Sequence, residues 1–354
     1  MGESPLLSAK ESEIKSLLSL SARIGCDPSL AQASSGNTSL KRDGILWIKA
    51  SGKWLADAEQ GDILVPLHLK EVRSCLRRNL DMTGTYPTPS GMHLRASVET
   101  AMHAVIPCRV VVHVHSVNTI ARAVRQDAHV EFSERLEGLP WCWIPYIASG
   151  IPLAREIEKV LSRAPNTQIF VLGNHGLVLA GQTCGSVEKL LETIETRLAT
   201  GSRHTAPPQF NQMIPMTRNS IWRLPADDAL HSLGTDPQAR QIASSGVLYP
   251  CQAIFLGGSA AVVPPSSQPA ANSLTQYEGK PFVVVDGCGV LVNDKITNAE
   301  QAMLSGFGRV VQRIDPTAPI RYLSELELGE LLREDVYKYR DLAVRNGTGC
   351  RASA

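Results

Sequence analysis

The chain has 354 residues, a net charge of +1 and 43% apolar residues, which is enough to bury a substantial core and predicts two domains. The near-zero charge, without a dense basic run, argues against nucleic acid as a partner. No apolar stretch approaches the length of a membrane span, and the N-terminus lacks the features of a signal peptide. The eight cysteines are scattered, without a Cys-x-x-Cys pair. We therefore expect a cytoplasmic protein with reduced thiols and no membrane partner.

The first hundred residues predict helices, a strand pair and two polar turns. A capping box at Ser8 predicts a helix that ends near residue 25, and apolar spacing predicts another over 66–80. Between them, small-residue turns at 35–38 and 51–52 bracket a strand pair. Backbone N–H groups of such turns bind phosphate or carboxylate, although a plain polar hairpin is the commoner outcome. Lysines nearby serve an anion or are simply solvated: Lys41, Lys49 and Lys53.

The stretch 97–119 carries most of the candidate chemistry. Ser97 is typical of an N-cap and predicts a short helix with Glu99 in its first turn. A β-branched run then predicts a strand that leads into His113 and His115. Because alternate side chains of a strand share a face, the two imidazoles should lie side by side. They form half of a divalent-metal site, and imidazole suits zinc.

A third ligand is expected from His175, which lies in Gly-Asn-His-Gly between two apolar, strand-like runs. Glycines on both sides favour a tight turn that presents the imidazole at a strand end. Three histidines with one open position are the arrangement of a catalytic zinc site. A His-x-His pair is also common without a metal. His103, four residues after Glu99, is an alternative ligand, although a packing or hydrogen-bonding role is favoured for it.

The rest of the chain predicts more strands and helices and then a second unit. Helices are expected at 116–124, from 151 and at 186–198, with strands at 141–147 and on both sides of His175. Further along, an Asp-Gly turn predicts a hairpin at 281–292, and capping boxes at Thr297 and Ser324 predict helices to about 314 and 339. We therefore expect a first domain over 1–203, a linker over 204–219 and a smaller α/β domain of unknown role over 220–354.

Five short motifs occur in order over residues 35–177: Ser-Gly-Asn-Thr-Ser, Lys-Ala-Ser-Gly, Ser-Val-Glu-Thr, His-Val-His-Ser and Gly-Asn-His-Gly-Leu. Together they resemble the class II aldolase/adducin family, and most of all the aldolase-like part of rhamnulose-1-phosphate aldolase/alcohol dehydrogenase proteins. The spacing from Glu99 to His113 is similar to that branch, whereas fuculose-phosphate aldolases have a longer interval. The resemblance is strong over about the first 200 residues and weaker through the C-terminal helices.

The resemblance implies an α/β fold, a three-layer α/β/α sandwich around a mostly antiparallel sheet, usually assembled as a homotetramer. It implies that His113, His115 and His175 hold one Zn²⁺ per chain, or another divalent metal, and that Glu99 is the acid/base. The residues implied to line a phosphate pocket are Gly36, Asn37, Ser51, Gly52 and Ser97.

The implied reaction cleaves a ketose 1-phosphate or related hydroxy-ketone to dihydroxyacetone phosphate and an aldehyde. Zinc would stabilise the enediolate as a Lewis acid, the carboxylate would move the hydroxyl proton, and the anion-binding turns would position the phosphate. Three other residues are candidates for a second base: Glu131, Glu134 and Tyr146.

Other functions of the same fold remain open: a sugar-phosphate 4-epimerase, a decarboxylase, or a non-catalytic adducin-like interaction module. The module is disfavoured because it would be expected to lack the ligand histidines. The chain departs from the resembled branch at Ala96, where Pro is usual, and at Cys251 and Gln252, where Asp and His are common. We also expect no fused dehydrogenase domain, so the substrate need not carry phosphate.

Overall fold

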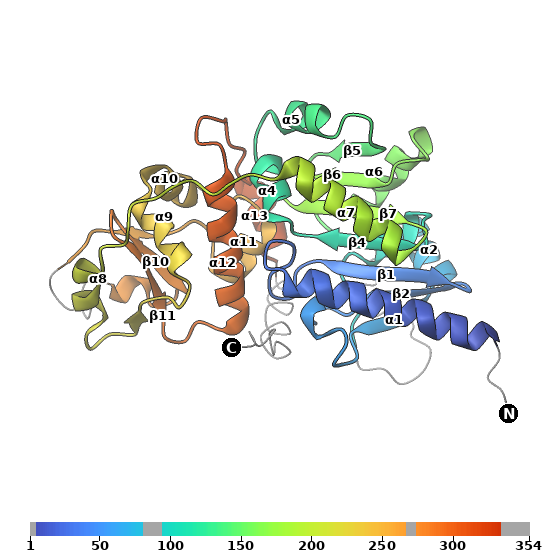
Figure 1. The fold of residues 1–354 in the computed structure, drawn as a ribbon, viewed down its shortest axis with the longest axis horizontal. Helices are drawn as coiled ribbons and strands as arrows, with labels where there is room; N and C mark the ends of the chain where they lie inside the picture. The colour runs from blue at the N-terminus through green and yellow to red at the C-terminus, as the bar shows by residue number, and fades with distance from the viewer. Residues whose placement is uncertain (1–4, 81–93, 267–273, 334–354) are drawn as a thin grey trace.

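The computed structural model describes residues 5–80, 94–266 and 274–333, and it contains two sheets (Figure 1). The larger sheet has seven strands in the order β3-β2-β1-β4-β7-β6-β5. All neighbouring strands are antiparallel except β5 and β6, so the predicted α/β fold with a mostly antiparallel sheet is confirmed. The strands are β1 (Asn37–Arg42), β2 (Ile45–Lys49), β3 (Leu64–His68), β4 (Val110–Val114), β5 (Trp141–Ile144), β6 (Ile169–Leu172) and β7 (Gly176–Gly181).

Helices cover both faces of this sheet and complete three layers. One face packs against α1 (Pro5–Cys26), α4 (Val117–Ala123), α5 (Ala128–Arg135) and α7 (Cys184–Leu198), and Figure 1 shows α1 and α7 in front of the strands. The other face packs against α2 (Leu69–Arg77), α3 (Thr100–Val105) and α6 (Ile151–Arg163). Along β4, Val110, Val112 and Val114 face the first group, whereas Val111 faces the second. His113 therefore shares the α3 side of the sheet with Val111.

The smaller sheet has the order β8-β11-β10-β9, with β9 and β10 parallel. Its strands are β8 (Trp222–Arg223), β9 (Val262–Val263), β10 (Phe282–Val285) and β11 (Gly289–Asn293). The helices of this region are α8 (Phe210–Thr217), α9 (Ser232–Thr235), α10 (Pro237–Ser244), α11 (Pro250–Leu256), α12 (Asn298–Arg313) and α13 (Glu325–Leu331). Three short 3-10 helices complete the described elements: η1 (Leu55–Asp57), η2 (Asp228–His231) and η3 (Thr275–Tyr277).

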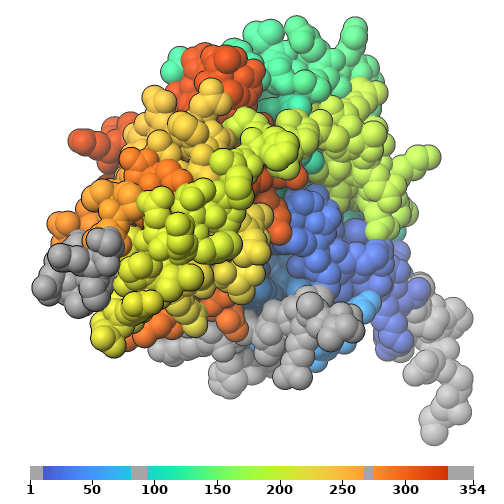
Figure 2. Space-filling model, turned by 60° about the vertical axis from the view of Figure 1, so that its left-hand side comes forward, coloured from blue at the N-terminus to red at the C-terminus, as the bar shows by residue number. Residues whose placement is uncertain are grey.

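One apolar core joins the two sheets. Trp54 and Ile120 of the first sheet's region belong to the same buried cluster as Phe255 of α11 and Phe307 of α12. Helix α12 packs against α4 at this junction, and Figure 1 shows it between the two sheets. The segment after α7 crosses the surface from one sheet to the other (Figure 2), and residues 210–217 of the predicted linker form α8.

Most predicted elements are present, and the differences lie at their ends. Helix α1 already begins at Pro5, where a proline is tolerated because the first helical N–H has no partner. Helix α2 begins only at Leu69, because residues 64–68 pair with β2 as strand β3. The N-cap position of α3 is Glu99 and not Ser97. Helix α13 ends at Leu331, and most of the remaining stretch to the predicted end near 339 lies outside the described residues.

The structure bears on two further expectations, the lack of a membrane-spanning helix and the state of the cysteines. No helix among the described residues is both long enough and apolar enough to cross a membrane. Six of the described cysteines are free thiols: Cys75, Cys108, Cys142, Cys184, Cys251 and Cys288. The expectation of reduced thiols throughout is wrong at Cys26, which is disulfide-bonded.

Candidate metal centre

Three strand ends meet where the predicted ligands lie. His113 is the fourth residue of β4 and pairs with Asn37 of β1, and His115 follows immediately after the end of β4. His175 lies in the tight turn from β6 to β7, after Asn174, which has a φ of +51°. A Cβ on Gly176 would stand 2.5 Å from the carbonyl oxygen of Val114, so only glycine lets this turn approach the end of β4. This close approach brings His175 beside the His-x-His pair.

The three imidazoles form a compact, buried group. Their candidate ligand atoms all lie within 4.8 Å of one another, and the Nε2 atoms of His113 and His115 are 3.1 Å apart. Two nitrogens bound to one tetrahedral zinc at 2.0–2.1 Å would be about 3.3 Å apart. The residues His113, His115 and His175 are 0%, 4% and 6% exposed. The spacing and the nitrogen donors therefore fit a single divalent cation.

Hydrogen bonds and burial favour the protonation state that a metal requires. His113 Nδ1 donates to the Leu177 carbonyl at 3.0 Å, which leaves the lone pair of Nε2 directed at the other rings. Burial lowers the pKa of His175 to about 4 and holds the pKa of His115 well below its usual range. At neutral pH both imidazoles are therefore uncharged, as metal ligands must be.

Glu99 is the carboxylate of this group. Its Oε2 lies 3.5 Å from His113 Nε2, and its Oε1 lies 3.4 Å from His175 Nε2. Burial acts to raise the pKa of Glu99, but the imidazoles of His113 and His175 and a 2.7 Å hydrogen bond from Asn37 Nδ2 outweigh it and lower the pKa to about 2. Ser149 Oγ also donates to Oε1 at 3.3 Å. The side chain is thus held ionised beside the three histidines.

A layer of polar side chains fixes Glu99 and Asn37. Ser97 Oγ accepts from the Glu99 backbone N–H and from Asn37 Nδ2, both at 3.2 Å, instead of capping α3. His103 binds Ser39 Oγ through Nδ1 at 2.7 Å and Asn37 Oδ1 through Nε2. Both ring nitrogens of His103 are therefore occupied, which supports the hydrogen-bonding role and not the ligand role.

The two small-residue turns lie next to each other beside this layer. Lys49 Nζ donates to the carbonyl oxygens of Ser34 and Lys53, at 2.8 Å and 2.6 Å, and so ties one turn to the other. The Ser51 N–H donates to the Arg95 carbonyl at 2.8 Å, two residues from Ser97. Gly36 and Gly52 both have positive φ, +68° and +74°. Gly36 and the pair of Ser51 and Gly52 therefore lie in adjoining turns, Ser97 lies just before α3, and Asn37 is the first residue of β1 and is engaged with Glu99.

Two of the three nearby lysines are buried, although one sequence interpretation had allowed all three to be solvated; Lys53 is half-buried. Lys49 and Lys41 are both buried, and burial lowers the pKa of each ammonium to about 7. Lys41 Nζ donates to the Cys108 carbonyl at 2.9 Å.

Of the suggested second bases, only Tyr146 lies beside the His175 turn, where its backbone nitrogen is 3.1 Å from a Cβ built on Gly173. Burial raises the pKa of Tyr146 to about 12, so its phenol is a proton donor at neutral pH. Glu131 of α5 is paired with Arg122 of α4 and Arg135 of α5, and Glu134 is exposed on α5.

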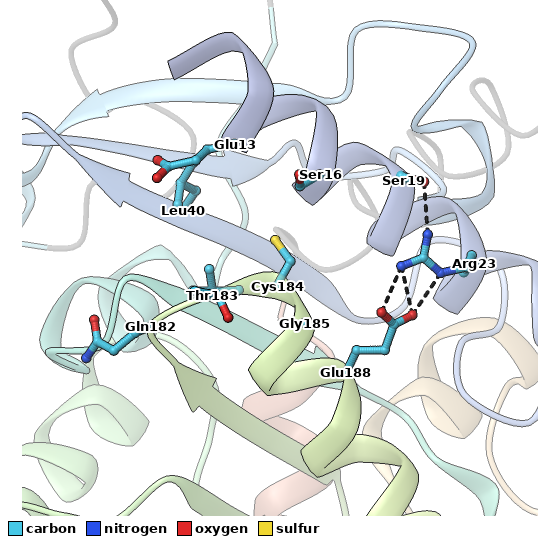
Figure 3. Close-up of a pocket in the computed structure, with 11 residues that line it drawn as sticks. Glu13, Ser16, Ser19, Arg23, Leu40, Gln182, Thr183, Cys184, Gly185 and Glu188 are labelled. Carbon is cyan, nitrogen blue, oxygen red and sulfur yellow. Dashed lines mark hydrogen bonds and ion pairs between the residues drawn. The ribbon is translucent and has the colours of Figure 1, made fainter. Parts of the chain in front are cut away.

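A separate surface pocket of about 400 Å³ lies between α1 and α7 (Figure 3). Arg23 of α1 and Glu188 of α7 both line this pocket and form an ion pair, and Arg23 also donates to Ser19. None of the histidines or Glu99 lines this pocket. It is therefore distinct from the candidate metal centre.

Sequence reasoning missed two residues that contact this centre from far along the chain. Cys251 Sγ lies 3.5 Å from His115 Nδ1, and Arg321 Nη1 donates to Asn174 Oδ1 at 2.9 Å. The only sequence signal was the departure at Cys251 and Gln252 from the resembled branch.

Among known proteins, the chain is similar to "Uncharacterized oxidoreductase YuxG" of Bacillus subtilis (strain 168), at 26% identity over 185 residues. The match covers 48% of this chain and 27% of that relative. A solved structure of the N-terminal class II aldolase domain of a conserved protein from Thermoplasma acidophilum is 23% identical, with a TM-score of 0.47, over 56% of this chain and 95% of that one. The L-fuculose-1-phosphate aldolase from Thermus thermophilus is 20% identical, with a TM-score of 0.36, over 52% and 92%.

The family profile described as "Class II Aldolase and Adducin N-terminal domain" matches residues 16–200, more than half of the chain and the whole of the region that holds the three histidines and Glu99. The protein therefore belongs to the class II aldolase and adducin N-terminal domain family.

Proposed function

We propose that the protein is a zinc-dependent aldol lyase that cleaves a ketose 1-phosphate or related hydroxy-ketone to dihydroxyacetone phosphate and an aldehyde. The observation that carries this proposal is the buried group of three histidines with an ionised carboxylate 3.4–3.5 Å from two of them. Family membership supports an enzyme of this class. A divalent cation bound there would act as a Lewis acid on the substrate carbonyl and its neighbouring hydroxyl.

The residues of the candidate metal centre have distinct parts in this scheme. His113, His115 and His175 would hold the cation, and Glu99 would accept the hydroxyl proton whose loss starts carbon–carbon cleavage. Asn37 and Ser149 orient the Glu99 carboxylate through hydrogen bonds, and Ser97 accepts from the Glu99 backbone N–H. Backbone N–H groups of the turns at Gly36 and Gly52 would bind the substrate phosphate and so position the reacting bond.

The first experiment measures metal content per chain by elemental analysis, in the wild type and in a His113→Ala/His115→Ala double variant. We expect about one zinc per chain in the wild type and none in the variant, because two of the ligands are gone. His204→Ala is the matched control, since it removes an exposed histidine outside the cluster and should leave the metal unchanged. A wild type without metal, even after addition of zinc, would refute the proposal.

The second experiment tests the reaction. Zinc-loaded wild type is incubated with a panel of ketose 1-phosphates, and aldehyde and dihydroxyacetone phosphate are measured together. Equimolar release of both supports a lyase. Conversion to an epimeric sugar phosphate, or release of carbon dioxide from an acid substrate, would instead identify the epimerase or decarboxylase alternative. The homotetramer implied by the resemblance stays a prediction, to be tested by light scattering.

A further inference from the structure

Residues of the second sheet's region hold the turn that carries His175. Asn174, which precedes it, is 1% exposed and has a φ of +51°. Its side-chain Nδ2 donates to the carbonyl oxygens of Leu248 and Arg321, both at 2.8 Å. Its Oδ1 accepts from Arg321 Nη1 at 2.9 Å. The side-chain hydrogen bonds of Asn174 therefore go to residues more than 70 positions away in the chain.

Arg321 is itself fixed on three sides. Its Nη2 is paired with Glu327 of α13, and its guanidinium lies 5.5 Å from the centre of the Tyr146 ring. Its backbone N–H donates to the Val124 carbonyl at 2.7 Å, next to Ala123, whose carbonyl accepts from the Asn174 N–H at 3.0 Å. Arg321 and Asn174 thus meet at the end of α4, the helix that follows His115. A guanidinium held in this way is a rigid donor for the Asn174 side chain.

A second contact from the same region reaches His115. Cys251, in the first turn of α11, is buried, and its Sγ lies 3.5 Å from His115 Nδ1, the ring nitrogen opposite the cluster. The next residue, Gln252, accepts from the Leu248 N–H at 2.8 Å and donates to the Gly246 and Gly258 carbonyls. Gln252 therefore fixes the same Leu248 segment whose carbonyl binds Asn174.

We propose that segments 246–252 and 320–327 form a positioning element for the metal ligands, with Arg321 orienting the His175 turn and Cys251 orienting the His115 ring. The proposal rests on the metal site of the proposed function. It gives the second unit a role, because His115 contacts that unit directly. His175 is held by it through the preceding residue, Asn174. Groups that orient a ligand from outside the coordination sphere change metal affinity by about 10–100-fold when they are removed.

The test titrates Co²⁺ into the metal-free full-length protein and follows its visible absorption spectrum, which reports ligand number and geometry. The variants are Arg321→Ala, Arg321→Lys and Cys251→Ala. Arg240→Ala is the matched control, since it removes a guanidinium that pairs with Asp286, the residue after β10. Thermal unfolding of each metal-free variant is measured in parallel, so that global unfolding is recognised.

We expect Arg321→Ala to weaken Co²⁺ binding about tenfold or more and to shift the absorption bands. Arg321→Lys should lie between Arg321→Ala and the wild type, because a lysine keeps the charge but not the forked donor. Cys251→Ala should alter the Co²⁺ spectrum, because the His115 ring loses its contact with the Cys251 thiol and is no longer held in one orientation. Arg240→Ala should bind as the wild type does. The inference is overturned if Arg321→Ala and Cys251→Ala keep the wild-type affinity and spectrum, or if Arg240→Ala weakens binding equally. A wild type that binds no Co²⁺ would instead refute the metal site and the proposed function themselves.

Discussion

Replacing Glu99 by glutamine should remove a defined part of the protein's acid sensitivity. The carboxylate is 5% exposed and is surrounded by His113, His175 and the Asn37 amide. Glutamine keeps the shape and can still accept a hydrogen bond from Asn37, but it carries no charge. The substitution therefore removes the charge of Glu99, and with it the charge coupling to the histidines, while the packing around it is kept.

The magnitude follows from the pKa. The folded protein lowers the pKa of Glu99 from 4.5 to about 2. Because the folded pKa is the lower one, the carboxylate stabilises the fold above pH 4.5, and this contribution is lost as the pH falls toward 2. A difference of about 2.5 in pKa corresponds to ~3 kcal/mol. About 2 kcal/mol of this would be lost by pH 3.

The assay is urea unfolding of the metal-free wild type and Glu99→Gln at pH 3 to 7. The difference in the free energy of unfolding between them should shrink by about 2 kcal/mol from pH 6 to pH 3. Glu13→Gln serves as a control, because Glu13 also has a lowered pKa but is partly exposed beside Arg42 and Arg109. The difference in the free energy of unfolding between the wild type and Glu13→Gln should change less with pH, because solvent screens the ion pairs of Glu13. A difference for Glu99→Gln that stays constant, or grows on acidification, would refute this account of the site.

Three further changes have expected outcomes. Asn37→Ala removes the 2.7 Å hydrogen bond to Glu99, so the pKa of Glu99 should rise by about 1, and the part of the stability that depends on its ionisation should be lost about one pH unit higher in the same urea titrations. Ser51→Ala should raise the KM for a phosphorylated ketose and leave kcat unchanged, since it removes binding shared by ground and transition states; an unchanged KM would contradict the phosphate-pocket assignment. Gly176→Ala should cost about 1–3 kcal/mol of stability and weaken metal binding, because a Cβ would stand 2.5 Å from the Val114 carbonyl. Gly185→Ala, where a Cβ meets nothing within 4 Å, is its control and should be neutral or slightly stabilising.

The elements that the sequence predicted well are those governed by local rules. The capping boxes at Thr297 and Ser324 are both formed, and the hairpin expected near 281–292 is β10 and β11. Strand alternation placed His113 and His115 on one face, and their Nε2 atoms are 3.1 Å apart. Each of these depends on residues within a few positions of one another, where backbone geometry leaves few choices.

What the sequence by itself determined, then, was the family, the mostly antiparallel sheet and the residues that carry the candidate chemistry. Tertiary structure alone decided how those residues are held. Cys251 meets His115 across 136 residues, Arg321 meets Asn174 across 147, and Lys49, which could have been solvated, is buried between two turns. No local period encodes such contacts, because they arise where α11 and the segment after α12 meet the residues that follow β4 and β6. Burial there also sets the pKa values of Glu99 and His175, which a sequence read in isolation leaves at their ordinary values.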